Sequence, residues 1–332
     1  MRGTVCLMLG TFWSCTLWAG CALHKGPAAD PSPTALDEFL DDPVLMPRRE
    51  GTFAGSDGRK LGFVAHCQSG QSPLAALVYL HGIESHAAWF DIAGELLRDK
   101  GYDVFCLDRR GSGVNRENRG FVSGHADSYR LLLEDVRFFV QPLRRHYEHV
   151  VLVGLSWGGK QAVAYTLTYP HELDGLILIT PGLRALVDAG PLTRARTLIA
   201  SGVSPRTQIP LPIEAEMFTT TPVFLKYIQE DPLRLKSASA RFLVESHRME
   251  GYIDRHMPKN RLPILLFLAG QDRIIDNAGV LRVLERGGQD VLDVVEYEDQ
   301  THSIQFDAPE RLVNDMARWI GQQCGSARAK RE

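Results

Sequence analysis

Short apolar runs alternate with amphipathic stretches along most of the chain. The runs are too brief for buried helices and contain many branched residues, which predicts strands covered on both faces. They are LAALVYL (74–80), YDVFCLD (102–108), HVVLVGL (149–155), LDGLILIT (173–180), LPILLFLAG (262–270) and VLDVVEYE (291–298). Helical spacing covers residues 86–101, 125–147, 158–170, 278–286 and 309–323. This alternation predicts an α/β fold whose mostly parallel sheet has helices on both faces.

Two segments depart from the alternation. GTFAGSDGRKLGFVAHC (51–67) has two strand patterns joined at Ser56-Asp57-Gly58, and Asp-Gly favours a tight hairpin turn. The segment from about 182 to 260 contains helical fragments and several prolines, and no strand is expected there. Because it lies between two sheet strands, we expect it to form a cap over one end of the sheet, where ligands of open α/β sheets bind.

Composition narrows the class of protein only slightly. The 332 residues are 44% hydrophobic and 23% charged, with a formal net charge of −3, which gives no reason to expect nucleic acid as a partner. Beyond the N-terminal region the cysteines are Cys67, Cys106 and Cys324. This sparse, odd set predicts neither a disulfide framework nor a metal site.

The N-terminus has the pattern of a processing segment. A positive start is followed by an uncharged apolar run that is short for a bilayer span and is expected to be a signal peptide over 1–20. LWAGC (17–21) resembles the lipobox of bacterial lipoproteins, so Cys21 is the expected lipidation site and the protein an exported, membrane-anchored lipoprotein. A plain secretory signal, giving a secreted or periplasmic protein, and an uncleaved anchor remain alternatives.

The rest of the chain divides into three expected parts. Residues 21–47 are rich in Ala, Pro and Asp and are expected to be a flexible tether. Residues 48–323 are expected to form the α/β domain, including the cap at about 182–260. Residues 324–332 are expected to be a charged C-terminal tail.

A candidate nucleophile lies where the strand pattern 149–155 gives way to a helix. Gly154-Leu155-Ser156-Trp157-Gly158 matches G-x-S-x-G, and a strand before with a helix after is the setting of a nucleophile elbow. Glycine is required at positions 154 and 158 because side chains there would crowd the sharp turn. The alternative is a glycine-rich turn whose serine only caps the helix.

A serine hydroxyl needs a base, and the base needs an acid that orients it. His302 lies in the EDQTHS loop between the last strand and the last helix, and is preferred as the base over His171 and His247. Asp272 directly follows the strand 262–270 and is preferred as the acid over Asp276, because a strand end fixes a side chain better than a mid-loop position does.

The developing negative charge requires two backbone donors. The amide of Trp157, next after the serine, is the first candidate. The amide of Ile83 is the second, because His81-Gly82 lets the loop after the strand 74–80 approach the serine closely. His81 itself is expected to make a structural hydrogen bond within that loop.

With these motifs together, the chain resembles the serine α/β-hydrolases of the monoacylglycerol lipase and lysophospholipase group, which are serine aminopeptidase S33-like. The resemblance extends from about Gly51 to Gly321. It rests on HGIESHAAWF with Glu84 and His86, DRRGSGVN (108–115), GLSWGG, AGQDRIID, THSIQFDAPE and the cap segment MFTTTPVFLKYIQEDPLRL (217–235). Many members of the group have methionine where this chain has Trp157.

The resemblance implies an α/β-hydrolase fold and hydrolysis of carboxylic esters, lipid-like in their acyl group, without a metal or organic cofactor. Ser156 would attack the carbonyl, His302 would accept its proton and Asp272 would hold His302. Apolar cap residues would line the acyl site or pack the cap onto the body: Leu211, Met217, Phe218, Val223 and Phe224.

Three other activities remain open from the sequence. Acyl transfer to an alcohol would use the same residues. An aminopeptidase would need an acidic group for the substrate amine, for which Glu214, Glu216 and Glu230 are available. A non-catalytic binding protein is disfavoured, because the three triad residues are present in the expected order.

Overall fold

An eight-stranded sheet with the order β1-β2-β4-β3-β5-β6-β9-β10 organises the molecule. The computed structural model describes residues 35–41, 48–68, 72–187 and 189–329, all of which belong to one unit, Pro33–Glu332. The strands are β1 (Arg48–Ala54), β2 (Lys60–His66), β3 (Ala76–Leu80), β4 (Asp103–Leu107), β5 (Val150–Leu155), β6 (Gly175–Ile179), β9 (Ile264–Ala269) and β10 (Leu292–Tyr297). β1 and β2 form the expected hairpin, β2 is antiparallel to β4, and the other pairs are parallel.

Successive strand residues contribute to two separate cores, as the strand period of two requires. In β3, Ala76, Val78 and Leu80 pack on one face of the sheet, while Leu77 and Tyr79 pack on the other. All five residues of β3 are buried, which explains why its sequence is an unbroken apolar run.

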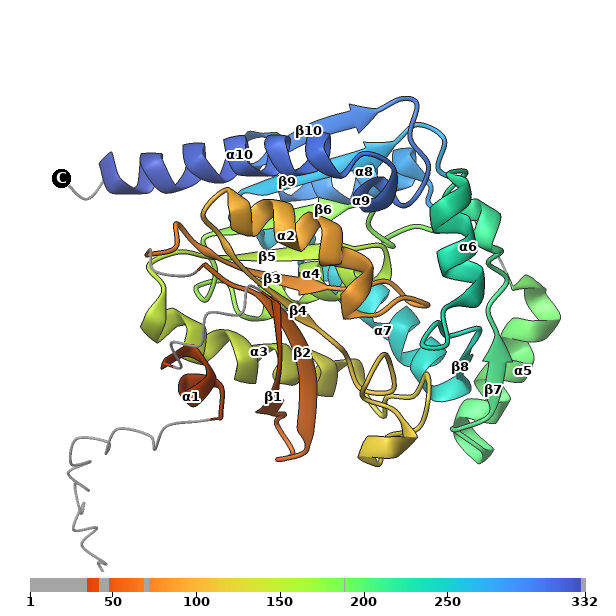
Figure 1. Cartoon of the computed structure of the whole chain (residues 1–332). Helices are drawn as coiled ribbons and strands as arrows, with labels where there is room; N and C mark the ends of the chain where they lie inside the picture. Colours follow the sequence, from red (N-terminus) through yellow and green to blue (C-terminus); the bar gives the residue numbers. More distant parts are fainter. Residues whose placement is uncertain (1–34, 42–47, 69–71, 188, 330–332) are drawn as a thin grey trace, which may run out of the picture. The chain divides into compact units, whose positions relative to one another are not determined.

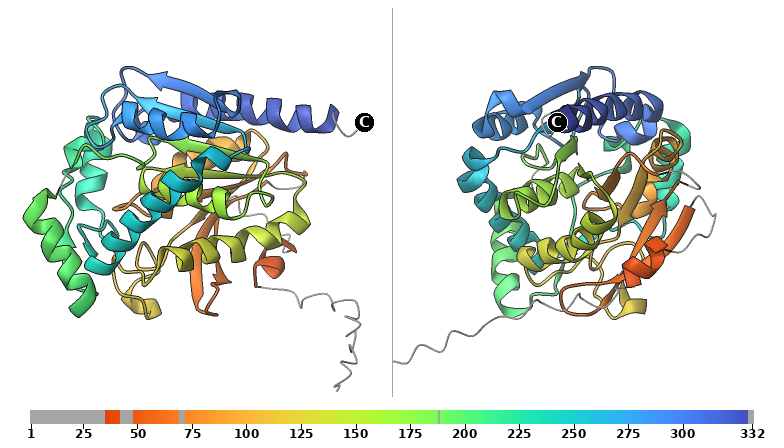
Figure 2. Two further views of the ribbon diagram at one scale, coloured as in Figure 1. Left: turned by 180° about the vertical axis from the view of Figure 1, so that it is seen from behind. Right: turned by 90° about the vertical axis from the view of Figure 1, so that its left-hand side faces the viewer.

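Helices cover both faces of this sheet (Figure 1). They are α2 (Asp91–Asp99), α3 (Tyr129–His146), α4 (Trp157–Thr168), α8 (Asn277–Leu284), α9 (Ile304–Asp307) and α10 (Pro309–Ala329). α2 and α10 lie together on one face, and the view from behind in Figure 2 shows α3 and α4 on the other. Single 3₁₀ turns occur at Ala87–Phe90, Glu117–Arg119, Ala215–Met217, Met257–Lys259, Glu285–Gly287 and Gln289–Val291.

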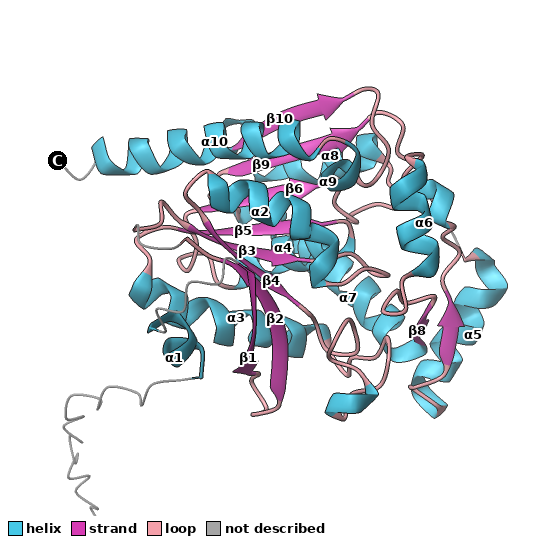
Figure 3. Ribbon diagram, in the orientation of Figure 1, coloured by secondary structure: helices cyan, strands magenta, loops and turns pink. Residues whose placement is uncertain are grey.

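The inserted segment forms a cap at the end of the sheet toward which the parallel strands point (Figure 3). It contains α5 (Gly190–Val203), α6 (Pro222–Glu230) and α7 (Ala240–His256). The expectation of no strand there was wrong, because β7 (Gln208–Pro210) pairs with β8 (Ser237–Ser239). Each of these strands is only three residues long, too short to leave an alternating pattern in the sequence.

Both ends of the described chain are more structured than expected. Part of the expected tether 21–47 is the helix α1 (Ala35–Asp41), in which Leu36 is buried and Asp37 pairs with Arg145 of α3. The last helix continues to Ala329, into the segment 324–332 expected to be a tail. The expected signal peptide and Cys21 lie outside the described residues. Within the described part of the chain, no helix combines the length and the apolar character that a membrane span needs.

Candidate active site

Ser156 occupies the sharp turn between β5 and α4. Its φ of 52° and ψ of −123° lie in a region that non-glycine residues rarely adopt. The carbonyl of Ser156 accepts hydrogen bonds from Gly159 at 2.9 Å and Gly182 at 2.6 Å, which holds the strained residue in place. The serine does not cap the helix with its side chain, so the alternative of a simple capping serine is not supported.

Close packing around the turn accounts for the flanking glycine. A Cβ added at Gly158 would lie 2.1 Å from the carbonyl oxygen of Leu80 at the end of β3. The turn therefore presses directly against the loop that follows β3. A side chain at position 158 would push the nucleophile away from that loop.

His302 and Asp272 form a buried pair. The Nδ1 atom of His302 lies 2.8 Å from Oδ2 of Asp272, and both side chains are fully buried. The other carboxylate oxygen of Asp272 accepts from the amides of Ile274 and Ile275 at 2.8 and 3.0 Å. This arrangement leaves the buried Nε2 of His302 without a hydrogen-bond partner in the described structure, which is the atom a serine proton would reach.

The rival residues lie elsewhere. Asp276 caps α8 by accepting from the amide of Gly279, and its side chain is partly exposed. The side chain of His247 is 87% exposed and pairs with Glu250 on α7. His171 is exposed in the loop between α4 and β6. The structure thus brings Asp272, and not Asp276, to the selected histidine.

The loop after β3 runs beside the nucleophile. A Cβ added at Gly82 would lie 3.3 Å from the Cβ of Ser156, so the peptide that carries the amide of Ile83 lies next to the serine. His81 has the structural role expected of it, because its Nδ1 lies 2.8 Å from the Gly82 carbonyl. Burial, together with the charge of Arg109, keeps the pKa of His81 well below its usual value.

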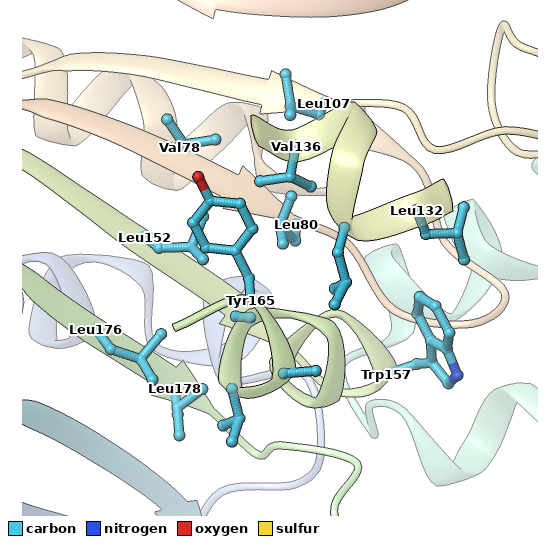
Figure 4. Packing of buried hydrophobic residues seen from close by; sticks show 14 of the residues in the cluster. Val78, Leu80, Leu107, Leu132, Val136, Leu152, Trp157, Tyr165, Leu176 and Leu178 are labelled. Carbon is cyan, nitrogen blue, oxygen red and sulfur yellow. The ribbon is translucent and has the colours of Figure 1, made fainter. Parts of the chain in front are cut away.

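Trp157 faces the cap. Its indole Nε1 donates to Ser246 of α7 at 2.9 Å, and its ring packs against Phe242 with centroids 4.8 Å apart. The buried Lys160, one turn later in α4, also contacts Ser246 and pairs with Glu250. Figure 4 shows the Trp157 ring at one end of the apolar cluster that packs around α4. The backbone amide of Trp157 belongs to the first turn of α4, whose N–H groups lack intrahelical acceptors.

The expected acyl-site residues occupy different environments. Phe218 is buried, and its ring centroid is 5.7 Å from that of His302. Leu211 lines a cavity of about 590 Å³ between α5 and α7. Phe224 stacks on Phe306, Met217 packs against the core, and Val223 is exposed. Only Phe218 and Leu211 therefore have positions that suit substrate contact.

Two sets of polar contacts that the sequence did not reveal, one of them an ion pair, attach the loop after β3 to the cap. Glu84 and Arg234 are both buried and lie 2.7 Å apart, and the Glu84 carbonyl accepts from the Leu235 amide. His86 and Trp89 both contact Oδ2 of Asp231, at 3.0 and 2.6 Å. Burial raises the pKa of Glu84 to about 7. In the sequence, only the Glu84 and His86 pattern in this loop pointed to these contacts with the cap.

No group of three or more His, Cys, Asp or Glu side chains within the described residues is arranged to hold a metal ion. The site combines a serine in a strained turn with a buried imidazole–carboxylate pair. Such an arrangement suits nucleophilic attack on an acyl carbon.

Comparison with known proteins agrees with this geometry. Residues 71–309 match the family model Hydrolase_4, described as serine aminopeptidase, S33. Monoglyceride lipase of Mus musculus is 23% identical over 284 residues, which cover 83% of this chain and 92% of the mouse protein. Phospholipase YtpA of Bacillus subtilis is 24% identical over 244 residues, covering 72% of this chain and 91% of the relative.

Solved structures confirm the fold. A soluble variant of monoglyceride lipase from Saccharomyces cerevisiae, solved with a substrate analog, superposes with a TM-score of 0.73 at 19% identity. The match covers 85% of this chain and 97% of the yeast chain. Because the family model spans well over half of the sequence, the chain belongs to the serine aminopeptidase S33 family and has the α/β-hydrolase fold.

Proposed function

We propose that this protein is a serine hydrolase that cleaves carboxylic esters with a lipid-like acyl group, through an acyl-enzyme on Ser156. The observation that carries the proposal is the strained Ser156 turn together with the buried pair of His302 and Asp272. The names of the relatives, monoglyceride lipase and phospholipase, support an ester of the lipid class.

In this mechanism, Ser156 attacks the ester carbonyl while Nε2 of His302 accepts its proton. Asp272 holds the imidazole in the tautomer that leaves Nε2 free to accept, and stabilises the imidazolium that forms. The amides of Ile83 and Trp157 donate to the oxyanion. His302 then protonates the leaving alcohol. In the second half of the reaction, His302 accepts a proton from water as that water attacks the acyl-enzyme, and returns it to Ser156 as the acyl–serine bond breaks and the carboxylic acid leaves.

The cap cavity suits an acyl chain. Apolar side chains form much of its lining: Val187, Leu198, Ile209, Leu211, Leu243 and Val244. Ser246, which also lines the cavity, accepts the hydrogen bond from Trp157, so the cavity adjoins the tryptophan that follows the nucleophile. Burial of each methylene of an acyl chain there would contribute about 0.8 kcal/mol.

Covalent labelling combined with a substrate series tests this function. A fluorophosphonate is expected to label the wild type and to fail with Ser156→Ala and with His302→Ala. Hydrolysis rates are expected to rise with acyl length in an ester series and to exceed those for aminoacyl amides. Labelling that survives Ser156→Ala would refute the nucleophile, whereas a preference for acetyl esters would refute the lipid class.

We also propose that the protein is exported and carries lipid on Cys21. The support is the sequence LWAGC after an apolar run. Cells fed a labelled fatty acid are expected to transfer label to the wild type and not to Cys21→Ser, with the wild type in the membrane fraction. Cys6→Ser is a matched control, and equal labelling of wild type and Cys21→Ser would refute lipidation at this cysteine.

A further inference from the structure

Arg109 is a buried cation whose guanidinium donates hydrogen bonds to main-chain carbonyls. It follows β4 and is 8% exposed. Its Nη1 donates to the Gly82 carbonyl at 2.7 Å, and its Nη2 donates to the Ile83 carbonyl at 2.6 Å. Within the described residues no carboxylate accepts a hydrogen bond from this side chain. Burial lowers the pKa of its guanidinium to about 9. A buried charge without an ion-pair partner is costly, so its position calls for an explanation.

The carbonyl contacts determine where the neighbouring amide points. In a trans peptide the C=O and the following N–H point in opposite directions, and the described residues contain no cis peptide. The Arg109 amide donates to Nε2 of His81 at 3.2 Å, so Nδ1 of that histidine carries the proton and also donates to the Gly82 carbonyl. Two donors thus hold this carbonyl on one side, and the Ile83 amide points to the other.

The same guanidinium also contacts Trp157, the other residue expected to donate to the oxyanion. Its central carbon lies 4.8 Å from the ring centroid of Trp157 and 5.2 Å from that of Phe242. Cations at this distance from an aromatic face are attracted to it. Arg109 therefore touches both the peptide that presents the Ile83 amide and the side chain of Trp157.

We propose that Arg109 is a positioning residue that keeps the Gly82–Ile83 peptide oriented so that the Ile83 amide serves the oxyanion. Gly82 has no side chain to resist rotation of this peptide. If the peptide flipped, the Gly82 carbonyl would present a partial negative charge where the Ile83 amide had been. The inference rests on the proposed hydrolase function and assigns a role to a residue outside the triad.

Substitution of Arg109 separates this role from a general structural one. Arg109→Met removes both carbonyl contacts, while Arg109→Lys keeps a positive charge that lacks the planar fork needed to reach two carbonyls. Both variants are expected to lower kcat by about 10- to 100-fold, because loss of one oxyanion donor costs on the order of 100-fold or more. KM is expected to change by less than about threefold, since the oxyanion forms only after substrate has bound.

Two further measurements make the test specific. Affinity for a trifluoromethyl ketone, which forms a tetrahedral oxyanion on the serine, is expected to fall in proportion to kcat, while affinity for an uncleaved amide analogue stays the same. Arg110→Met is the matched control, because Arg110 is equally buried but binds the carboxylates of Asp57 and Asp135. This control is expected to lower Tm and to leave the kcat of the folded protein unchanged.

The outcomes distinguish the inference from the function on which it rests. If wild-type protein hydrolyses esters through Ser156 and both Arg109 variants keep kcat within about twofold, the positioning role is wrong. A kcat loss that leaves ketone affinity unchanged, or one that Arg110→Met reproduces, would also overturn it. If the wild type shows no Ser156-dependent hydrolysis, the proposed function itself fails.

Discussion

In the buried pair of Asp272 and His302, backbone amides fix the orientation of the aspartate carboxylate toward the histidine. Two amides that follow Asp272 bind one of its carboxylate oxygens, so only the other oxygen faces the histidine. The aspartate cannot rotate without losing these hydrogen bonds. Its orientation is therefore fixed before any substrate arrives, as electrostatic catalysis requires.

Exchange of this carboxylate for an amide is expected to affect activity far more than stability. Asp272→Asn would leave His302 without an anionic partner and favour the wrong tautomer, and kcat is expected to fall by about 10³- to 10⁴-fold. Asp276→Asn is the control, because that residue caps α8 and pairs with Arg282 but does not contact His302. Steady-state kinetics on both variants check the expectation, and equal losses of activity would contradict it.

Glu84 is expected to make stability depend on pH. Since burial raises its pKa to about 7, the folded protein binds a proton more tightly than the unfolded chain does between about pH 4.5 and 7. The stability contributed by this proton is present below that range and is lost as pH rises through 7. Relative to Glu84→Gln, the wild type is thus expected to lose about 2 kcal/mol of unfolding free energy between pH 5 and 8.

Denaturant titration at several pH values measures this difference. Glu216→Gln is a suitable control, because Glu216 lines a polar cavity together with Glu84 but is itself exposed. A wild-type advantage that stays constant or grows with pH would show that the Arg234 pair, rather than burial, governs Glu84.

At the scale of elements, α1 shows that a polar, proline-containing segment can still supply core packing. Leu36 is 1% exposed within the core cluster. The ring of Phe39 packs edge-on against Phe63 of β2, and the guanidinium of Arg49 lies over the face of the Phe39 ring. The helix therefore belongs structurally to the catalytic unit.

Truncation of Leu36 is expected to destabilise the fold without altering catalysis. Leu36→Ala removes a buried side chain and should lower the free energy of unfolding by about 2 kcal/mol. Leu74→Ala makes the same change at a site that is 59% exposed and should cost less than about 0.5 kcal/mol. Chemical denaturation and ester kinetics on both variants test this, and equal costs would contradict the packing of α1.

The sequence predicted the elements whose pattern is strong and missed those held by tertiary contacts. Every strand of the large sheet coincides with an expected strand pattern, and Asp272 and His302 meet as their order in the chain predicts. α1 is a single short helix, and its seven residues have too few turns for a clear helical period. The roles of Arg109 and Arg234 depend on carbonyls and carboxylates far away in the sequence, which no local pattern reports.

At the scale of the molecule, every residue proposed to take part in catalysis belongs to the unit Pro33–Glu332. Ser156 and Asp272, the proposed nucleophile and acid, follow strand ends of the sheet, while the cap contributes Phe218 against His302 and Arg234 against Glu84. The N-terminal segment is thus expected to decide where the enzyme resides and not what it does.

A chain that begins at Pro33 is expected to fold and to keep the kcat and KM of the full protein on soluble esters. The comparison needs steady-state kinetics and thermal unfolding of the two chains. Deletion through Asp41 serves as the control, because it removes α1 and should lower Tm. A large loss of kcat in the chain from Pro33 would show that the N-terminal segment contributes to the site.

The crowding around Ser156 has a consequence for motion. Gly158 leaves no space for a methyl group beside the turn, and Gly182 leaves little, since its added Cβ would lie 3.1 Å from the Ser156 carbonyl. A nucleophile packed this tightly has little freedom to move toward its substrate. We therefore expect the displacements that admit a substrate to arise in the cap, on the microsecond to millisecond scale typical of lids. The serine turn would then fix the geometry of the reaction, while motion of the cap would set how fast a substrate enters.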